Sequence, residues 1–195
     1  MIPRHNLRLS ITHEEINDLP LGAFEGKVVI VSEEKNVPRA FAEIHEHKEV
    51  GFDTETKPVF VKGQQNKVSL MQIATPDTVF LIRLKFTGMH PAILNFLEND
   101  KILKAGVALR DDIKALQRLK HYEPGGFIEL ADLSKKAGLQ VESVKKLTAV
   151  LLGFRISKSA QTSNWEAESL NEKQISYAAT DAWVCLEIYK RLMSL

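Results

Sequence analysis

The sequence predicts an α/β fold in which helices cover a mixed β-sheet, and three observations lead to this prediction. The β-rich segments 50–55, 67–74 and 78–82 follow one another closely enough to pair as an antiparallel meander. From residue 91 onward, helical and strand periodicities alternate, which is typical of α/β proteins. The 195 residues, 44% of them hydrophobic, are enough for one well-packed domain and too few for two enzymatic ones.

The elements follow in order along the chain. Thr12 and Glu15 have the spacing of a helix capping box, so a short helix is expected there, ending at residues 17–20. Residues 1–26 are therefore predicted to form an N-terminal arm with a short helix, ahead of a domain at 27–195. Outside the meander, the predicted strands are 28–31, 102–105 and 127–130, and the predicted helices are 37–47, 91–98, 110–120 and 172–193.

Composition limits the class of protein and its compartment. No apolar run is long enough to span a bilayer and the N-terminus lacks the apolar core of a signal peptide, so we expect a soluble, cytoplasmic protein with no membrane partner. Cys185 is the single cysteine, which excludes an internal disulfide and a zinc site built from cysteines. The formal net charge of +1 argues against a protein that coats nucleic acid through bulk electrostatics.

A polyanionic ligand would therefore need a local basic site. One stretch carries six basic residues against two acidic ones, a local excess of +4. An ordinary solvated helix face is the favoured interpretation of this stretch when it is taken alone. The basic residues are Lys101, Lys104, Arg110, Lys114, Arg118 and Lys120, and the acidic ones are Asp111 and Asp112.

Two carboxylates occupy one predicted strand. Asp53 and Glu55 are two residues apart in the segment 50–55, so the pleat of the strand points both side chains to the same face. Like charges side by side repel each other unless a cation holds them, and an all-oxygen pair suits a divalent ion such as Mg²⁺ or Mn²⁺. For this pair alone, solvated acids at an exposed strand end remain the simpler interpretation.

Two further acids lie at the start of the helix predicted at 110–120. Asp112 shares a helical face with Leu109 and Leu116, whereas Asp111 lies on a face with charged neighbours. We therefore expect the side chain of Asp112 to point towards the protein body and that of Asp111 to point towards solvent. Of the two, Asp112 is the candidate for a functional acid.

The helix predicted at 172–193 carries another acid beside a tyrosine. Tyr177 and Asp181 stack at positions i and i+4 on the flank of an apolar stripe, so both can border the core and still reach a cleft. Packing plus a surface charge explains such a pair equally well when it is taken alone. Trp165, just ahead of this helix, is expected to be a packing residue.

Three sequence segments that contain these acids follow one another along the chain: FDTET at 52–56, KAGVALRDDIKAL at 104–116 and YAATDA at 177–182. Their order and rough separations resemble the three sequence motifs of the DEDD exonucleases. The spacing of Tyr177 and Asp181 resembles the tyrosine subgroup, which includes ribonuclease D and the Werner-syndrome exonuclease domain; the histidine subgroup would need His at the position of Ser176. The second motif departs from the pattern, because Asp111 and Asp112 stand together where the family shows one acid.

The resemblance covers about 27–195 and implies a ribonuclease H-like fold, with a mixed five-stranded sheet flanked by helices and room for one extra edge strand. It implies a 3′-5′ exonuclease that hydrolyses phosphodiester bonds from the free 3′ end of DNA or RNA and releases nucleoside 5′-monophosphates. It also implies two divalent cations, Mg²⁺ or Mn²⁺, held by four carboxylates, and an attacking water oriented by Tyr177. The carboxylates are Asp53, which would bridge both ions, Glu55, Asp112 and Asp181.

Two other functions stay open at the level of the sequence. One is a catalytically inactive nucleic-acid binding module of the same fold, which the intact set of acids and the tyrosine argue against. The other is a phosphoesterase that acts on nucleotides or short oligonucleotides, which the modest net charge favours slightly. The choice between DNA and RNA depends on how a pocket meets the 2′-hydroxyl group, which none of these motifs specifies.

Overall fold

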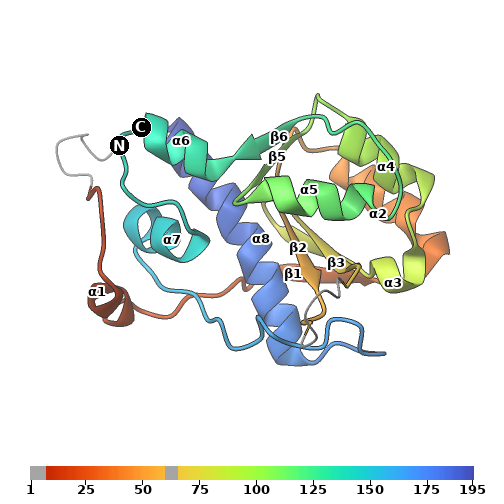
Figure 1. Cartoon of the computed structure of the whole chain (residues 1–195), viewed down its shortest axis with the longest axis horizontal. Coiled ribbons are helices and arrows are strands. Elements are labelled where there is room, and N and C mark those ends of the chain that lie inside the picture. Colours follow the sequence, from red (N-terminus) through yellow and green to blue (C-terminus); the bar gives the residue numbers. More distant parts are fainter. Residues whose placement is uncertain (1–7, 60–65) are drawn as a thin grey trace.

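A six-stranded mixed sheet forms the centre of the computed structural model, which describes residues 8–59 and 66–195 (Figure 1). Its strands are β1 (Lys27–Val31), β2 (Glu49–Thr56), β3 (Val68–Ala74), β4 (Thr78–Ile82), β5 (Leu103–Gly106) and β6 (Phe127–Glu129). The strand order is β1-β4-β3-β2-β5-β6. The pairs β2/β3 and β3/β4 are antiparallel, and the pairs β1/β4, β2/β5 and β5/β6 are parallel.

The pairing confirms the meander that the sequence predicts, because β2, β3 and β4 run antiparallel in succession. The sixth strand is β1, which adds to the outer edge of β4. The segment predicted as a strand at 127–130 is shorter, since the Glu129 side chain accepts a hydrogen bond of 3.2 Å from the Ala131 amide and so caps a helix that begins at Leu130.

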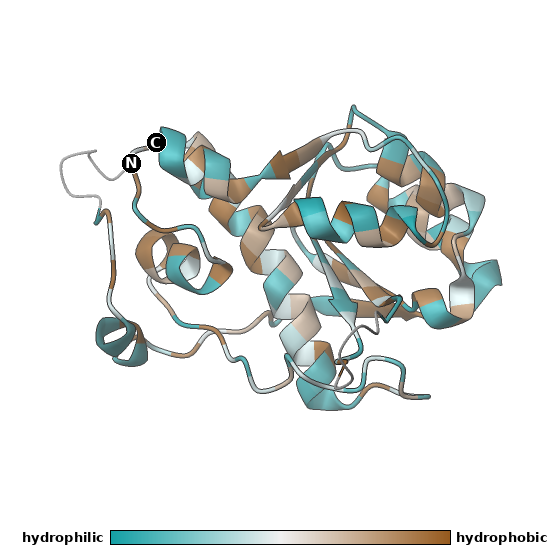
Figure 2. Cartoon of the chain, in the orientation of Figure 1, coloured by the Kyte–Doolittle hydropathy of each residue, from teal (hydrophilic) through white to brown (hydrophobic). Residues whose placement is uncertain are grey.

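Helices cover both faces of the sheet (Figure 1). They are α1 (His13–Asn17), a 3₁₀ turn η2 (Glu34–Asn36), α2 (Val37–Ile44), α3 (Leu84–Thr87), α4 (Pro91–Glu98), α5 (Leu109–Gln117), α6 (Leu130–Lys136), α7 (Val144–Leu152) and α8 (Glu172–Met193). Apolar residues of α2, α4 and α5 pack with Phe52 and Met71 on one face. On the other face α8 crosses the strands, and α6 and α7 pack on α8. Figure 2 shows the amphipathic character of α5, with hydrophilic and hydrophobic residues on different sides.

Gly51 determines how closely α8 approaches β2. A Cβ atom built on Gly51 would lie 1.9 Å from the carbonyl oxygen of Ala182 in α8, far inside any tolerable contact. Only a residue without a side chain therefore lets the helix backbone pass over the strand at this point. The crossing brings Asp181, the neighbour of Ala182, over the part of β2 that carries Asp53.

Lys104 in β5 is fully buried, so the sequence-based view of it as one of six surface cations is wrong. Its Nζ donates hydrogen bonds to the carbonyl oxygens of Asn99 at 2.7 Å, Ile102 at 3.0 Å and Gly125 at 2.8 Å, and lies 4.8 Å from the centroid of the Phe96 ring. An ammonium has three donors, and here each has an acceptor. Burial nevertheless lowers the pKa of Lys104 to about 8.

The N-terminal arm packs on the domain through main-chain contacts. The short helix is confirmed: α1 begins with a capping box, in which Thr12 and Glu15 bond each other's backbone amides. Leu21 then forms an isolated bridge with Arg155. The first seven residues of the predicted arm, 1–7, lie outside the described residues. Across 8–59 and 66–195, no helix is both long and apolar enough to span a bilayer.

Candidate active site

Three of the predicted acids meet where α8 crosses β2. Asp53 and Glu55 point to the same face of β2, as the period of a strand requires, and Asp181 comes from the helix above them. One carboxylate oxygen of each lies within 4.8 Å of the others. The oxygens are therefore close enough together to bind a shared cation, and carboxylates are the ligands that hard divalent ions prefer.

The electrostatics of this cluster favour a bound cation. Burial, followed by the negative charges of Asp181, Glu55 and Asp112, raises the pKa of Asp53 well above its usual value. Burial is also the main cause that raises the pKa of Glu55 to about 9, with Asp181 and Asp112 adding to it. These carboxyl groups cannot all be ionised without mutual repulsion. A divalent cation would remove that repulsion, so the residues present fit a metal ion.

Asp112 lies beside this cluster, held by a contact that the sequence did not reveal. The hydroxyl of Thr54, between the two acids of β2, donates a short hydrogen bond to Oδ1 of Asp112. Burial raises the pKa of Asp112 to about 6, although the hydrogen bond from Thr54 opposes the shift. Asp111 is exposed, whereas Asp112 is partly buried, in agreement with the helical phase of the two residues. Asp112 is not among the three acids whose oxygens lie within 4.8 Å of one another.

The start of α5 is fixed by a residue that sequence reasoning missed. The Glu129 carboxylate accepts hydrogen bonds from the amides of Ala108 at 3.1 Å and Leu109 at 3.0 Å. Ala108 is the helix N-cap and has a left-handed backbone with φ of 60°, a conformation that usually favours glycine. Because the helix begins with this turn, its first turn is aimed at β2 and Asp112 reaches Thr54.

Tyr177 borders the cluster from α8. Its hydroxyl hydrogen-bonds the Asp181 carboxylate one helical turn away, and burial, followed by the charges of Asp181 and Glu55, raises its pKa far above the usual value. The phenol therefore keeps its proton at neutral pH. Its ring centroid lies 5.9 Å from that of Trp165, which is fully buried, so the prediction that Trp165 is a packing residue is confirmed.

A cavity of about 300 Å³ opens beside the acids. The wall opposite the acids comes from the N-terminal end of α7 and from the segment that leads towards α8. Lys158 is exposed and also lines this cavity. Burial raises the pKa of Asp181 to about 6, and the charge of Lys158 opposes this shift. The remaining lining residues beyond the acids and Tyr177 are Thr54, Val107, Ala108, Ser143, Val144, Lys145, Ile156 and Gln161.

Sequence reasoning also missed Gln72. It lies directly opposite Asp53 in the β2/β3 register, so both side chains point to the same face of the sheet. Gln72 is fully buried, and neither atom of its amide has a hydrogen-bond partner within the described residues. A glutamine inside the fully buried β3 was the available signal, because a buried amide needs hydrogen-bond partners.

Comparisons with known proteins agree on one family. A sequence model described as 3′-5′ exonuclease matches residues 28–195. The chain is 34% identical to the bifunctional 3′-5′ exonuclease/ATP-dependent helicase WRN of Mus musculus over 152 residues, 75% of this chain and 11% of that protein. It is 30% identical to the exonuclease mut-7 homolog of Aedes aegypti over 212 residues, 96% of this chain and 27% of that protein.

Solved structures show the same fold. The EXO domain of Aedes aegypti Nibbler superposes with a TM-score of 0.78 at 26% identity, over 89% of this chain and 91% of that one. Escherichia coli RNase D superposes with a TM-score of 0.77 at 20% identity, over 86% of this chain and 44% of that one. The fold is thus ribonuclease H-like, as the resemblance implied. The chain spans about a third or less of the length of the curated relatives it matches.

Proposed function

The chain belongs to the 3′-5′ exonuclease family, and from this premise we propose that it removes nucleotides one at a time from the free 3′ end of a DNA or RNA strand. The products would be nucleoside 5′-monophosphates. The observation that carries the proposal is the cluster of three recessed carboxylates, with mutual distances under 4.8 Å, beside the hydroxyl of Tyr177. Like-charged groups gathered inside a cavity destabilise the fold, so their presence together indicates a functional role.

The acids would hold two divalent cations, Mg²⁺ or Mn²⁺. The charges of the other three acids all act on Asp53, which would bridge both ions, with Glu55, Asp181 and Asp112 completing the ligands. When bound, such ions neutralise the phosphodiester, lower the pKa of the attacking water and stabilise the leaving 3′ oxygen. Thr54 fixes the carboxylate of Asp112 by its hydrogen bond, so the ligand on α5 keeps one orientation.

Tyr177 would orient the attacking water. Its proton is engaged with Asp181, so a lone pair of its hydroxyl oxygen is free to accept a hydrogen bond from a water molecule in the cavity. Because the phenol stays neutral, it adds no further negative charge to a site that is already rich in carboxylates. The ring, held by Trp165, keeps the hydroxyl in place while the water reacts.

The cavity would receive the last nucleotide of the strand. Val107, Val144 and Ile156 offer apolar surface to a base, and Lys145 and Lys158 offer positive charge to a phosphate. The modest volume of about 300 Å³ also fits a second candidate function, a phosphoesterase of mononucleotides or short oligonucleotides. Substrate length separates the two, because an exonuclease should act on a long strand at least as well as on a dinucleotide.

Digestion of matched strands tests the proposal. DNA and RNA of one sequence, a dozen nucleotides long and labelled at the 5′ end, should shorten by single nucleotides in the presence of Mn²⁺ or Mg²⁺. Asp53→Asn keeps the shape of the side chain and removes its charge, so it should slow shortening by about 10³-fold or more. A parent protein that stabilises on adding Mn²⁺ yet shortens neither strand would refute the activity. Internal cuts, in place of a ladder from the 3′ end, would refute the polarity.

A further inference from the structure

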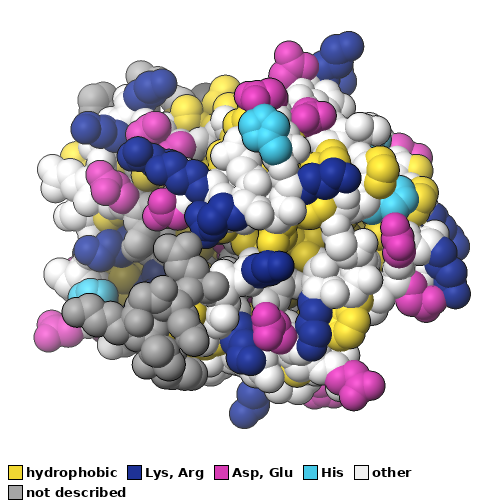
Figure 3. Space-filling model, turned by 45° about the vertical axis from the view of Figure 1, so that its right-hand side comes forward, with side chains coloured by type: hydrophobic (Ala, Val, Ile, Leu, Met, Phe, Trp, Pro, Cys, Tyr) yellow, Lys and Arg dark blue, Asp and Glu magenta, His cyan; other side chains and the backbone are white. Residues whose placement is uncertain are grey.

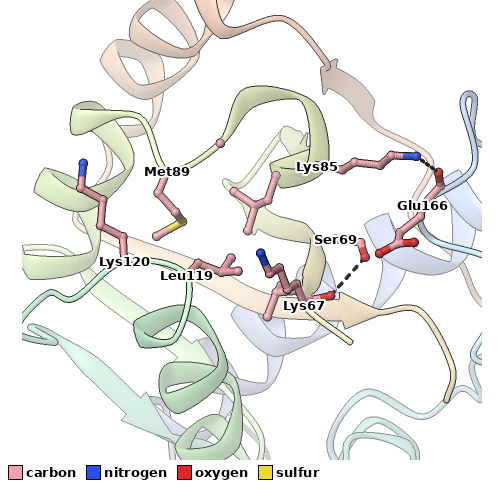
Figure 4. A pocket seen from close by; sticks show the side chains of 10 residues that line it. Lys67, Ser69, Lys85, Met89, Leu119, Lys120 and Glu166 are labelled. Atoms are coloured by element: carbon pink, nitrogen blue, oxygen red, sulfur yellow. Dashed lines mark hydrogen bonds between the residues drawn. The ribbon is translucent and has the colours of Figure 1, made fainter. Parts of the chain in front are cut away.

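A second cavity, of about 510 Å³, has lysines around it and an apolar floor (Figure 4). We call it the lysine-rimmed pocket. Its lysines come from three different parts of the chain: Lys67 precedes β3, Lys85 belongs to α3 and Lys120 follows α5. All three lysines are exposed. The apolar part of the lining consists of Val68, Leu84, Met89 and Leu119, and the other lining residues are Ser69, Gly88 and Glu166.

The charges of this pocket favour an anion. Glu166 is the one acid among the described residues that line it, and the carboxylate of Glu166 lies 3.4 Å from the Nζ of Lys57, which offsets its charge. The Nζ of Lys85 donates to the main-chain carbonyl of Glu166 at 2.6 Å, as the dashed line in Figure 4 shows. Within the described residues, the ammonium groups of Lys67 and Lys120 have no hydrogen-bond or ion-pair partner, so their charges are available to a ligand. Figure 3 shows Lys and Arg side chains gathered around hydrophobic atoms on this side of the molecule.

The pocket adjoins the acid cluster through two elements. Val68, on the pocket floor, pairs with Thr56, which directly follows Glu55 in β2. Glu166, on the pocket wall, directly follows Trp165, whose ring packs against Tyr177. Neighbouring strands lie about 5 Å apart and residues rise about 3.4 Å along a strand, so a chain of a few nucleotides can reach from one site to the other.

We propose that the lysine-rimmed pocket binds the upstream part of the same nucleic acid strand whose 3′ end enters the acid cluster. The inference rests on the proposed function and specifies its substrate as a single strand of several nucleotides. Lys67 and Lys120 contact backbone phosphates, and a base lies on the apolar floor around Met89 and Leu119. Positive charge beside an apolar surface matches the alternation of phosphates and bases in a strand. Single-strand binding proteins combine such charge with aromatic side chains, and here the side chains of Met89 and Leu119 supply the apolar surface.

A double variant that removes two positive charges tests the pocket. Lys67→Gln with Lys120→Gln removes both free charges and leaves Lys85, which holds the Glu166 carbonyl. The matched control, Lys135→Gln with Lys136→Gln, changes the net charge equally at exposed positions of α6, on the opposite side of Figure 1. Fluorescence anisotropy of a labelled single strand, a dozen nucleotides long, gives the dissociation constant with Ca²⁺ in place of a catalytic ion, so binding is measured without cleavage.

The pocket variant should bind the strand about tenfold more weakly at low salt, and the control should bind like the parent. The slope of log affinity against log salt concentration should become less steep by about 1.4, since each of the two lost phosphate contacts on a single strand contributes about 0.7 to the slope. An unchanged melting temperature checks that the variant is folded. Because the assay needs no cleavage, a parent that binds the strand but never shortens it would refute the proposed function and leave the pocket standing.

Three results would overturn the pocket assignment. The first is a pocket variant that binds the strand as tightly as the control does. The second is a parent that does not bind the strand at all. The third is displacement of the strand from the parent, but not from the pocket variant, by a nucleoside 5′-monophosphate alone, because the pocket would then hold a free nucleotide and not a continuous strand.

Discussion

Ionisable side chains lie inside two neighbouring strands, and their surroundings are opposite: one has hydrogen-bond acceptors as neighbours and the other has like charges. Lys104 in β5 pairs in register with Val50 in β2, three residues before Asp53. Each donor of the Lys104 ammonium meets a main-chain carbonyl, at 2.7 to 3.0 Å. Asp53 instead has other carboxylates as its neighbours, and together with burial they raise its pKa. A buried charge with matched partners completes the fold, whereas a group of like charges needs a partner from outside and marks a site of function.

The protonation states at neutral pH follow from this difference. The pKa of Lys104 is about 8, so the ammonium stays charged at pH 7 in spite of its burial. The pKa of Glu55 is about 9, so without a cation this carboxyl group is protonated at the same pH. The ammonium of Lys104 thus has all its partners within the protein, whereas the acids lack a positive charge to balance theirs. Substitutions in the two regions should therefore affect different quantities, stability for Lys104 and turnover for the acids.

The largest effect is expected at Asp112. Asp112→Asn should reduce single-turnover cleavage by about 10³-fold, roughly 4 kcal/mol in barrier, because it removes a charged ligand, while the melting temperature holds or rises. Asp111→Asn is the matched control one position away, and its exposed side chain predicts a rate within about twofold of the parent. The reverse ranking would show that Asp111 is the functional acid of the second motif.

Lys104→Met should show the opposite pattern. It removes the donor from three carbonyls, one buried and two part-buried, which should lower the free energy of unfolding by about 3 kcal/mol. Urea denaturation measures the loss, and the activity well below the transition should persist. Lys101→Met, an exposed neighbour, should change stability by less than about 0.5 kcal/mol. If the two variants have the same free energy of unfolding, the three hydrogen bonds of Lys104 do not stabilise the fold.

Tyr177→Phe tests whether the hydroxyl acts in the reaction or the ring only packs. The ring can still contact Trp165, so fold and metal binding should persist. Single-turnover cleavage at saturating Mn²⁺ and enzyme should slow by about 10²-fold, the low end for groups that position a proton transfer. Tyr189→Phe, on the same helix but in a different core cluster, should leave the rate unchanged. If the Tyr177→Phe variant cleaves within about threefold of the parent rate, Tyr177 does not orient the water.

A further expected effect is a pH dependence of the stability of the metal-free protein. The pKa of Glu55 is raised from 4.5 to about 9, and the pKa values of Asp112 and Asp181 are raised from 3.8 to about 6. A raised pKa gives stability that is full below the unfolded value and is lost as pH rises through the folded value. In a chelator, stability should therefore fall from about pH 4 to pH 9, by at most about 1.4 kcal/mol per pH unit for each proton.

The matched variant Glu55→Gln isolates this contribution. Its melting temperature should decline less steeply with pH than that of the parent, because one titrating group is gone. Saturating Mn²⁺ should bring the two slopes together, since a bound cation favours the ionised carboxylates at every pH in the range. Parallel slopes for parent and variant in chelator would mean that the acids do not repel one another as the geometry implies.

Much of the site could be predicted from local periodicity. The two-residue spacing of Asp53 and Glu55 predicts one face of a strand, and the four-residue spacing of Tyr177 and Asp181 predicts one face of a helix. Helical phase likewise separates Asp111 from Asp112. These predictions needed no tertiary information, because each depends on the geometry of a single element. Their roles as ligands remain predictions.

The rest depends on contacts between distant segments. Lys104 lies among basic residues in the sequence, so charge alone predicted a surface position. Its third acceptor is the carbonyl of Gly125, which a turn 21 residues further along the chain brings beside it. The wall formed by Ser143 and Lys145 carries no acid motif, and its place across from the acids follows from the packing of α7 on α8. No pattern within one element can reveal such a neighbour.

Gly51 has a consequence for anyone who would transfer this site to another protein. Copying the acids and the tyrosine onto a different sheet and helix would reproduce every functional group. The site would still be absent unless the recipient strand also carried a residue without a Cβ atom where the helix passes, because the helix backbone leaves no room there for a methyl group. In protein design, the transferable unit is therefore the crossing of a strand and a helix, and a residue with no side chain is part of it.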